Sequence, residues 1–339
     1  MAEPIPQQTR ALLLEQYNED VLEAIDSLKV VDRPVPSLQR GQVLVKIDAA
    51  PCNPSDLLLL QAKYGSLKTL PSVPGWEGTG KVIASGGGLL GAWLKGKRVA
   101  CGLNDDRDGT WAEYFVANAT DCVPLNRRLP IDQAASLIVN PMSAMGLLDL
   151  AAQGKHQAAV HTAGASQLGR MMIAMADRPL INIVRRKAQV ELLHSLGAKY
   201  VLNSSDGDFV EKLQEMCKRL KATIAFDAVA GSMTGTVLSA MPPKSTVYVY
   251  GALSERPCGN IDPVGLLFHE KKVEGFYLAT WLRSRNRLKV FGIARRLQKM
   301  LVEGRIETRI QRRLSLDEAV DGLKQYVRNM TDGKVLITP

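Results

Sequence analysis

A turn of small residues between two apolar stretches has the residue types and spacing needed to bind a phosphate group. It follows residues 158–162, which suit a buried strand, and precedes a stretch rich in Met and Ala. A strand–turn–helix of this kind points backbone N–H groups and the positive end of a helix dipole toward a pyrophosphate. The sequence therefore predicts a dinucleotide site in this turn, formed by Ala163, Gly164, Ala165, Ser166, Gln167, Leu168 and Gly169.

The end of the next apolar stretch, residues 180–184, predicts which dinucleotide is bound. Arg185 and Arg186 follow it directly, and no acidic residue stands there. An acid at this place would hold the ribose hydroxyls of NAD, whereas arginine suits the additional phosphate of NADP. We therefore expect NADPH, with Arg185 and Arg186 holding its 2′-phosphate.

The glycine motif departs from the usual G-x-G-x-x-G because Ser166 replaces the second glycine. Serine is small, and its hydroxyl could reach a phosphate oxygen. The alternative interpretation is an ordinary strand–turn–helix followed by two solvated arginines.

Composition narrows the class of protein. The 339 residues suffice for about two domains, and 46% hydrophobic and 23% charged residues are ordinary for a globular enzyme. No apolar run reaches the ~20 residues of a membrane span, and the polar residues 1–10 lack signal-peptide features. We therefore expect a cytoplasmic protein with no membrane partner. Five cysteines and four histidines are scattered without a Cys-x-x-Cys pair, which argues against a structural zinc lobe.

The formal net charge of +9 favours anionic partners. Basic residues gather late in the chain, between Arg283 and Arg313. Only 5% of the residues are aromatic and no nucleic-acid module is recognisable, so an anionic cofactor and substrate rank above nucleic acid.

The elements that must position these residues fall into two patterns. The first third predicts short strands over 11–14, 22–25, 42–47, 80–84, 97–101 and 112–116, with a helix over 54–62. Gly86–Gly88 is expected to be a flexible turn with no helix after it. From residue 131 a helical segment, interrupted at Asn140-Pro141, leads into alternating strands and helices, which predict an α/β doubly wound parallel Rossmann sheet. One long helix over 283–303, a helix over 315–329 and a last strand over 333–338 complete the prediction.

Several motifs together resemble the medium-chain dehydrogenase/reductase superfamily over nearly the whole chain. They are Asn53-Pro-Ser-Asp56, Pro74-Gly-Trp-Glu-Gly-Thr-Gly80, Gly96-Lys-Arg-Val99, Gly109-Thr-Trp-Ala-Glu-Tyr114 and the nucleotide segment. The zinc branch would need cysteine at Asn53, histidine at Trp76 and a four-cysteine lobe, so this chain is similar to the zinc-free branch. The best-known members of that branch are quinone oxidoreductases and 2-enoyl thioester reductases.

The resemblance implies domains and roles. Residues 1–132 would form a GroES-like β-rich catalytic domain, 133–276 a Rossmann NADP-binding domain, and 277–339 a return to the catalytic domain. Tyr64 matches the proton-donating tyrosine of the enoyl thioester reductases, and Asn53 and Trp281 would contact substrate. Further cofactor contacts would come from Asn140, Tyr250, Gly251, Ala252, Leu253, Phe276, Tyr277, Leu278 and Lys334. Pro74-Gly-Trp-Glu77, in contrast, is nearer the quinone-reductase pattern.

The function expected from this resemblance is zinc-independent hydride transfer from NADPH to an α,β-unsaturated carbonyl. The favoured substrate is a 2-enoyl thioester of CoA or acyl carrier protein. A quinone or enone reductase of the same fold and, less favoured, a non-enzymatic nucleotide- or RNA-binding protein remain open. The resemblance also implies a homodimer through an edge strand around Val247–Gly251.

Structural roles remain open for several of these residues. Tyr64 could be an aromatic wall, and Trp281 and His161 could be core residues. Asp56 and Glu77 more readily hold loop backbone than act in catalysis.

Overall fold

The computed structural model describes residues 5–103 and 107–339, and the chain divides into two compact units. Unit 1 comprises Met1–Asn140 and Leu288–Pro339, and unit 2 comprises Pro141–Arg287. Both divisions lie further along the chain than the boundaries expected after residues 132 and 276. Unit 2 is thus one continuous segment, whereas unit 1 is assembled from two segments that are far apart in the sequence.

Unit 2 is built on a six-stranded parallel sheet, which confirms the predicted doubly wound fold. The strand order is β10-β9-β8-β11-β12-β13. The chain therefore begins at β8 in the middle of the sheet, adds β9 and β10 on one side, and then adds β11, β12 and β13 on the other. The strands are β8 (Ala158–His161), β9 (Leu180–Val184), β10 (Tyr200–Asn203), β11 (Ala222–Asp227), β12 (Thr246–Val249) and β13 (Lys272–Gly275). All five residues of β9 are buried, as expected for a parallel strand that is covered on both faces.

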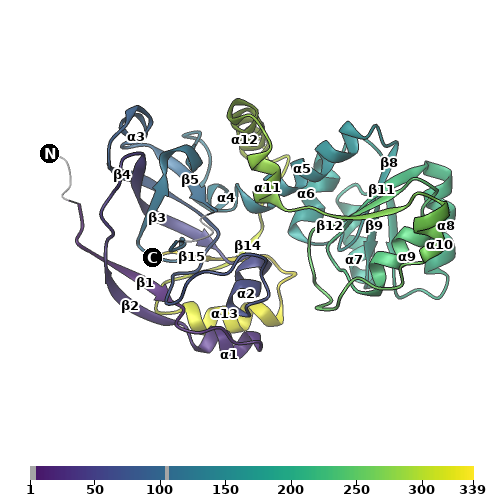
Figure 1. The fold of residues 1–339 in the computed structure, drawn as a ribbon, viewed down its shortest axis with the longest axis horizontal. Coiled ribbons are helices and arrows are strands. Elements are labelled where there is room, and N and C mark those ends of the chain that lie inside the picture. The colour runs from purple at the N-terminus through teal and green to yellow at the C-terminus, as the bar shows by residue number, and fades with distance from the viewer. Residues whose placement is uncertain (1–4, 104–106) are drawn as a thin grey trace. The chain divides into compact units, whose positions relative to one another are not determined.

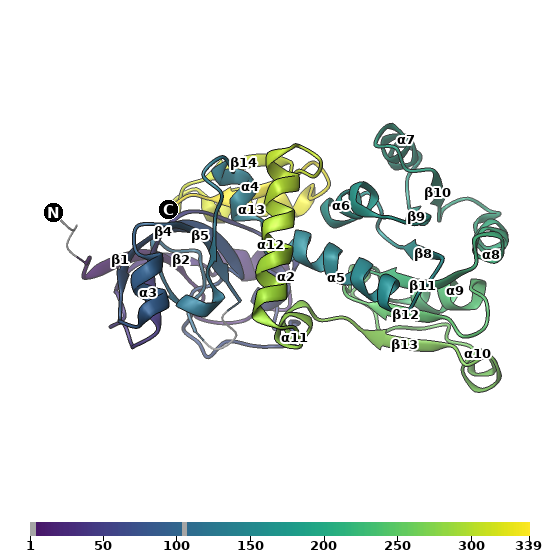
Figure 2. The same ribbon diagram turned by 90° about the horizontal axis from the view of Figure 1, so that it is seen from above.

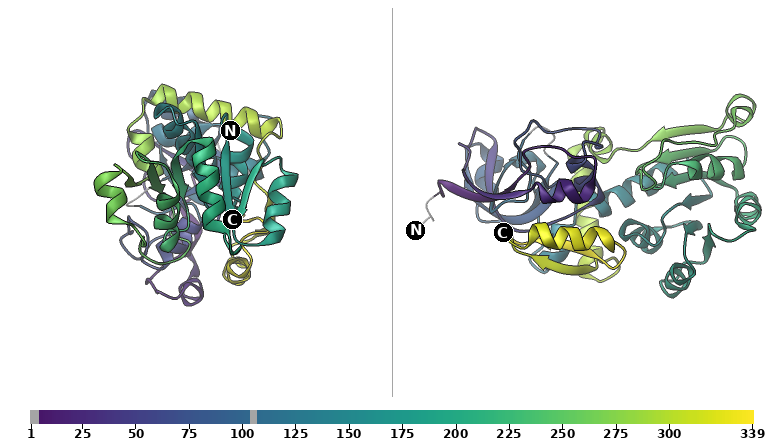
Figure 3. Two further views of the ribbon diagram at one scale, coloured as in Figure 1. Left: turned by 90° about the vertical axis from the view of Figure 1, so that its right-hand side faces the viewer. Right: turned by 90° about the horizontal axis from the view of Figure 1, so that it is seen from below.

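Helices cover both faces of this sheet (Figure 3). The helices in this part of the chain are α5 (Val139–Gln153), α6 (Gln167–Met175), α7 (Lys187–Ser195), α8 (Phe209–Leu220), α9 (Ser232–Ala240), α10 (Pro263–Phe268) and α11 (Leu278–Arg283). β8 lies within the stretch 158–162 expected to be a buried strand, and β9 matches the apolar stretch 180–184. The strand β13 and the helix α10 were not predicted.

Unit 1 contains a mainly antiparallel sheet in the order β14-β15-β3-β4-β5-β7, and β6 pairs with β3 as well. Its strands are β3 (Gln42–Pro51), β4 (Glu77–Ser85), β5 (Arg98–Gly102), β6 (Tyr114–Asn118), β7 (Val123–Pro124), β14 (Ile310–Leu314) and β15 (Lys334–Ile337). A separate antiparallel pair is formed by β1 (Gln8–Leu13) and β2 (Lys29–Pro34). The core of this unit includes the fully buried Trp111 and Phe115.

The helices of unit 1 come from both of its segments. They are α1 (Val21–Asp26), α2 (Pro54–Leu60), α3 (Leu89–Leu94), α4 (Ile131–Ala135), α12 (Arg287–Val302) and α13 (Ala319–Arg328), with a 3₁₀ turn at Ala119–Asp121. The last helix packs against the first, α13 on α1, so the two ends of the sequence share one core (Figure 1).

The strand expected over residues 22–25 is wrong, because this segment is the helix α1. Asp20 caps it by accepting hydrogen bonds from the backbone N–H groups of Leu22 and Glu23, at 2.8 and 3.0 Å. An aspartate followed three residues later by glutamate is a capping-box pattern that the sequence already contains. The strand β2 that follows α1 was missed.

Three further boundaries differ from the predictions. The flexible turn at Gly86–Gly88 connects β4 directly to the helix α3, so the expectation that no helix follows it is wrong. The helical break lies before Val139, and Pro141 sits in the first turn of α5, where its missing N–H costs nothing. The helix predicted over 283–303 corresponds to α12, which begins at Arg287, and the separate helix α11, which ends at Arg283, was not predicted (Figure 2).

The strand around Val247–Gly251 is not an edge strand. β12 lies between β11 and β13, so the edge of the sheet on this side is β13. Among the described residues, no helix combines the length and apolar composition that crossing a membrane requires.

Candidate active site

The turn between β8 and α6 needs its glycines for space. A Cβ on Gly164 would lie 2.9 Å from Cβ of Asn182, and one on Gly169 would lie 2.2 Å from the carbonyl oxygen of Gly164. Ala163 adopts a left-handed conformation with φ of 52°. The start of α6 is therefore drawn tightly against β8 and β9, the arrangement that lets a pyrophosphate approach a helix N-terminus.

Ser166 is the N-cap of α6. Its hydroxyl oxygen accepts a hydrogen bond from the backbone N–H of Gly169 at 3.1 Å. The serine thus takes a capping role that Gly, the usual residue at this place in the motif, would not supply.

Replacing Gly169 with alanine is expected to destabilise unit 2 by about 1–3 kcal/mol, because the new methyl group overlaps backbone that cannot move away cheaply. Thermal unfolding followed by circular dichroism measures the change. Gly275→Ala is the matched control, since a Cβ there meets no atom within 4 Å. Equal melting temperatures for the two variants would contradict the packing argument.

Arg185 and Arg186 follow β9 with exposed side chains. Their backbone N–H groups both donate to Oε1 of Gln189, each at 3.2 Å, which fixes the chain at the start of α7. Neither guanidinium pairs with a carboxylate among the described residues. Two adjacent cations without a protein counter-charge are well suited to a phosphate group.

A buried polar layer lies at the carboxyl end of the central strands. His161, which ends β8, is fully buried, and its Nε2 lies 2.7 Å from the Tyr250 hydroxyl. Burial lowers the pKa of His161 to about 3 and raises that of Tyr250, so both groups are neutral near pH 7. His161 is therefore a packed imidazole, one of the two roles considered for it.

The sequence analysis missed Asp227 at the end of β11. This buried carboxylate accepts hydrogen bonds from the hydroxyls of Thr162 and Thr234, at 2.8 and 2.7 Å, and from the backbone N–H of Val229 at 2.9 Å. It therefore fixes the loop that follows β11 at the edge where a dinucleotide binds. An aspartate ending a buried strand before small residues was the available signal.

The remaining predicted contacts in this part of the chain differ in exposure. Leu253 and Tyr277 are exposed, Asn140 is half-buried in the first turn of α5, and Leu278 is buried. Gly251 comes within contact of the chain after β11, since a Cβ there would lie 2.9 Å from the carbonyl oxygen of Ala228. Ala252 is exposed beside it.

Phe276, which is half-buried, and Trp281, which is buried, pack against each other in unit 2. Their ring centroids are 6.5 Å apart, and both rings face Gly146 of α5. Trp281 is 6% exposed, and the Arg285 guanidinium lies 5.3 Å from its ring centroid. This geometry favours the core-packing role of Trp281 over substrate contact.

In unit 1, Tyr64 is half-buried and its ring packs on that of Trp76. The centroids are 4.7 Å apart with an interplanar angle of 36°. The ammonium of Lys68 lies 4.8 Å from the Trp76 ring centroid. The ring of the candidate proton donor thus packs on the Trp76 ring, over which the Lys68 ammonium also lies.

Two buried carboxylates hold backbone around this ring pair. Asp56 accepts from the backbone N–H groups of Asn53 and Trp76, at 2.7 and 2.9 Å. Glu77 accepts from the backbone N–H groups of Ile138 and Val139, both at 2.9 Å, at the start of α5. This is the structural role favoured for both acids.

Asn53 and Lys334 are buried and bonded to each other. Lys334 donates from Nζ to Oδ1 of Asn53, whose Nδ2 donates to Oε1 of Glu77 at 3.1 Å. Burial lowers the pKa of Lys334, and the Glu77 carboxylate opposes that shift. Both ends of the Asn53 amide are therefore occupied within unit 1.

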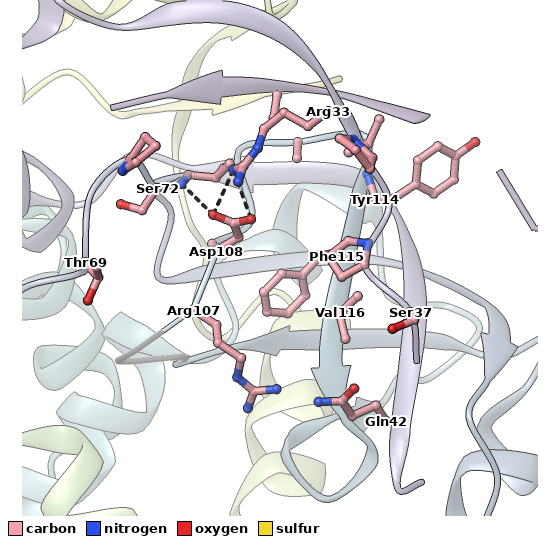
Figure 4. A pocket seen from close by; sticks show the side chains of 18 of the residues that line it. Arg33, Ser37, Gln42, Thr69, Ser72, Arg107, Asp108, Tyr114, Phe115 and Val116 are labelled. Atoms are coloured by element: carbon pink, nitrogen blue, oxygen red, sulfur yellow. Dashed lines mark hydrogen bonds and ion pairs between the residues drawn. The ribbon is translucent and has the colours of Figure 1, made fainter. Parts of the chain in front are cut away.

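A cavity of about 360 Å³ in unit 1 contains none of the predicted site residues. One wall carries the Arg33–Asp108 ion pair at 3.0 Å, and Asp108 also accepts from the backbone N–H of Val73 (Figure 4). Phe115 and Arg107 line the same cavity.

Comparison with known proteins identifies the family. Residues 39–127 match the alcohol dehydrogenase GroES-like domain, and residues 168–291 match the zinc-binding dehydrogenase family. A solved structure from Mesorhizobium loti, described as a putative NADPH:quinone reductase, is 34% identical. It aligns with 99% of this chain and 100% of its own, with a TM-score of 0.91. The chain belongs to the medium-chain dehydrogenase/reductase superfamily.

Other members of the superfamily extend the likeness. The mitochondrial enoyl-[acyl-carrier-protein] reductase of Arabidopsis thaliana is 28% identical over 81% of this chain and 73% of its own length. A structure of Etr1p with NADP and crotonyl-CoA has a TM-score of 0.80 at 22% identity, covering 98% of this chain and all of that one. The second likeness shows the shared fold. Both the expected family and the fold, a GroES-like domain plus a Rossmann sheet, are confirmed.

At two positions this chain lacks the residue types that bind zinc in the zinc-dependent medium-chain dehydrogenases. Asn53 and Trp76 stand where that branch needs cysteine and histidine. In residues 5–103 and 107–339, no group of three or more His, Cys, Asp or Glu side chains is arranged to hold a metal ion.

Proposed function

We propose that this medium-chain reductase transfers a hydride from NADPH to an α,β-unsaturated carbonyl, with a 2-enoyl thioester as the preferred substrate. The observation that carries the proposal is the pair of exposed arginines, Arg185 and Arg186, directly after β9 beside the glycine turn. Enoyl-[acyl-carrier-protein] reductases that align with about four-fifths of the chain support the thioester.

The residues of unit 2 fit NADPH. The pyrophosphate would lie at the turn 163–169, where the glycines permit close approach, and the 2′-phosphate at Arg185 and Arg186. In unit 1, the amide of Asn140, the last residue of its first segment, offers both a donor and an acceptor to a nicotinamide carboxamide. Bound NADPH supplies the hydride, which adds to the β-carbon of the substrate.

In unit 1 we assign the proton to Tyr64. A phenol has an ordinary pKa of ~10, so it is protonated at neutral pH and can donate to the α-carbon of the enolate that hydride addition leaves. Backbone N–H groups would stabilise the enolate oxygen. Because Asn53 and Trp76 cannot replace a cysteine and a histidine as zinc ligands, we propose that the reaction proceeds without zinc.

A quinone or enone reductase is the second candidate, favoured by Trp76 in the Pro-Gly-Trp-Glu motif and by the Mesorhizobium loti structure. NADPH consumption followed at 340 nm with crotonyl-CoA, an aliphatic enone, a small quinone and an aldehyde separates the candidates. We expect the highest kcat/KM with crotonyl-CoA. A higher value with the quinone would select the second candidate, and no turnover together with salt-sensitive RNA binding would select a non-enzymatic role.

We further propose that two copies associate through β13, the edge strand on this side of the sheet of unit 2. The preceding helix α10 exposes Leu267 and Phe268 by 73% and 75%, an apolar surface that a second copy would cover. Sedimentation equilibrium should give twice the chain mass, and Leu267→Glu with Phe268→Glu should give a monomer. A monomeric wild-type protein would contradict this proposal. A cytoplasmic location also stays a prediction, which imaging of the tagged protein would test.

A further inference from the structure

We propose that Asp56, with Lys334 as its counter-charge, positions the Tyr64 phenol through Trp76. The inference rests on the proposed function in one respect, that Tyr64 is the proton donor. Asp56 and Lys334 are positioning residues: Asp56 accepts from the backbone of Asn53 and Trp76, and Lys334 donates to Asn53.

The first step is the clamp that Asp56 makes. Its side chain is fully buried in the first turn of α2, and each carboxylate oxygen accepts one backbone N–H. Asn53 provides the N–H on one side, and Trp76, which immediately precedes β4, provides the other. One carboxylate therefore ties the start of α2 to the start of β4.

The second step is the Trp76 ring. The indole Nε1 donates to the carbonyl oxygen of Ser55 at 3.2 Å, and only 2% of the residue is exposed. Its backbone is held by Asp56 and its ring by Ser55, so both are anchored to the first turn of α2. The Tyr64 ring rests on this anchored surface, 4.7 Å between centroids. Releasing the Trp76 N–H would loosen the surface that orients the phenol.

The third step is the charge around Asp56. The groups that face it are Lys334 on β15, Glu77 on β4, the Cys52 thiol after β3 and the Tyr326 phenol on α13. Burial raises the pKa of Asp56 to about 7, the Glu77 carboxylate adds to the rise, and the Lys334 ammonium opposes it. Asp56 is therefore expected to ionise near neutral pH.

The sign of the pH effect follows from the two protonation states. Above pH about 7 the carboxylate accepts both N–H groups, whereas the protonated carboxyl presents an O–H that cannot accept as well. The clamp is therefore complete at the higher pH and partly released below it. We expect kcat to fall with a single ionisation as the pH drops through about 7.

A fluorescence titration tests the clamp without any substrate. The difference in emission between wild type and Trp76→Phe isolates the Trp76 signal, and its pH dependence should show one transition near neutrality. The same difference measured in an Asp56→Asn background should show no such transition. A wild-type signal that does not titrate, or one that titrates equally in Asp56→Asn, would overturn the proposal even if no acceptor substrate is found.

Kinetics test the effect on Tyr64. In Asp56→Asn, kcat should be about tenfold below wild type at pH 8 and should lose the acid limb, while KM for NADPH is unchanged. Leu57→Ala is the matched control, since it removes a buried side chain from the same helix and should lower stability but keep the acid limb. An acid limb retained in Asp56→Asn would refute the positioning role.

Lys334 provides a test that does not require Asp56→Asn to fold. Lys334→Met should move the acid limb to higher pH by about one unit, because Asp56 loses its counter-charge, and Lys334→Arg should restore it. The expected cofactor contact of Lys334 makes the opposite forecast: a raised KM for NADPH with an unmoved acid limb. That result would remove Lys334 from the proposal.

Discussion

Replacing Tyr64 with phenylalanine will lower kcat with crotonyl-CoA by about 10²-fold if the phenol is the general acid. The substitution keeps the ring that packs on Trp76 and removes only the hydroxyl, so the fold and the ring contact remain. KM for NADPH should not change, because Tyr64 belongs to unit 1 and the phosphate-binding residues belong to unit 2. Steady-state rates at saturating NADPH measure the effect.

Tyr114→Phe is the matched control for this experiment. Tyr114 is a half-buried tyrosine of β6 in the same unit, and it lines the cavity that contains none of the predicted site residues. Its hydroxyl should therefore be dispensable. Unchanged turnover in Tyr64→Phe would take the proton-donor role from Tyr64 and leave it as an aromatic wall.

Replacing both Arg185 and Arg186 with alanine will raise the Kd for NADPH by about 10²-fold and leave that for NADH nearly unchanged. Each substitution removes a charge-assisted contact with the 2′-phosphate that is worth about 1.4 kcal/mol, which corresponds to a tenfold change in Kd. Isothermal titration calorimetry with both dinucleotides measures the difference.

The control for the arginine pair is Arg219→Ala, an exposed arginine of α8 in the same unit. It should leave both dissociation constants in place. Raising the salt concentration should reduce the ratio of the wild-type Kd for NADH to that for NADPH, because salt screens exposed charges. Equal losses for NADPH and NADH would mean that the pair does not hold the 2′-phosphate.

The parallel sheet was predictable because its central strands β8, β9 and β11 are short apolar stretches separated by stretches of helical pattern. β9 matches the predicted apolar stretch 180–184 at both ends. The strand predicted over 22–25 was wrong because four residues with apolar ends fit both the helical and the strand period. The N-cap Asp20, which favours a helix, was not taken into account. The prediction that the strand around Val247–Gly251 is an edge strand was wrong, because strand order is a property of the whole sheet that no local sequence pattern encodes.

The candidate site was predictable in outline and not in its internal contacts. The glycine turn and the arginines are local signals, so they could be found from the sequence. The bond between Lys334 and Asn53 joins residues 281 positions apart, and the clamp of Asp56 on Trp76 spans 20. The bond from Lys334 depends on β15 pairing with β3, which the chemistry of single residues does not reveal.

The division of unit 1 into two segments has a consequence for biosynthesis. Its sheet stays incomplete until β14 and β15 have left the ribosome, whereas every residue of unit 2 has emerged by then. Domains generally fold as units during translation. The nascent chain should therefore contain a folded unit 2 while the first segment of unit 1 is still incompletely folded and accessible to chaperones. That segment acquires Lys334, the counter-charge of the buried Asp56 and Glu77, only when the end of the chain emerges.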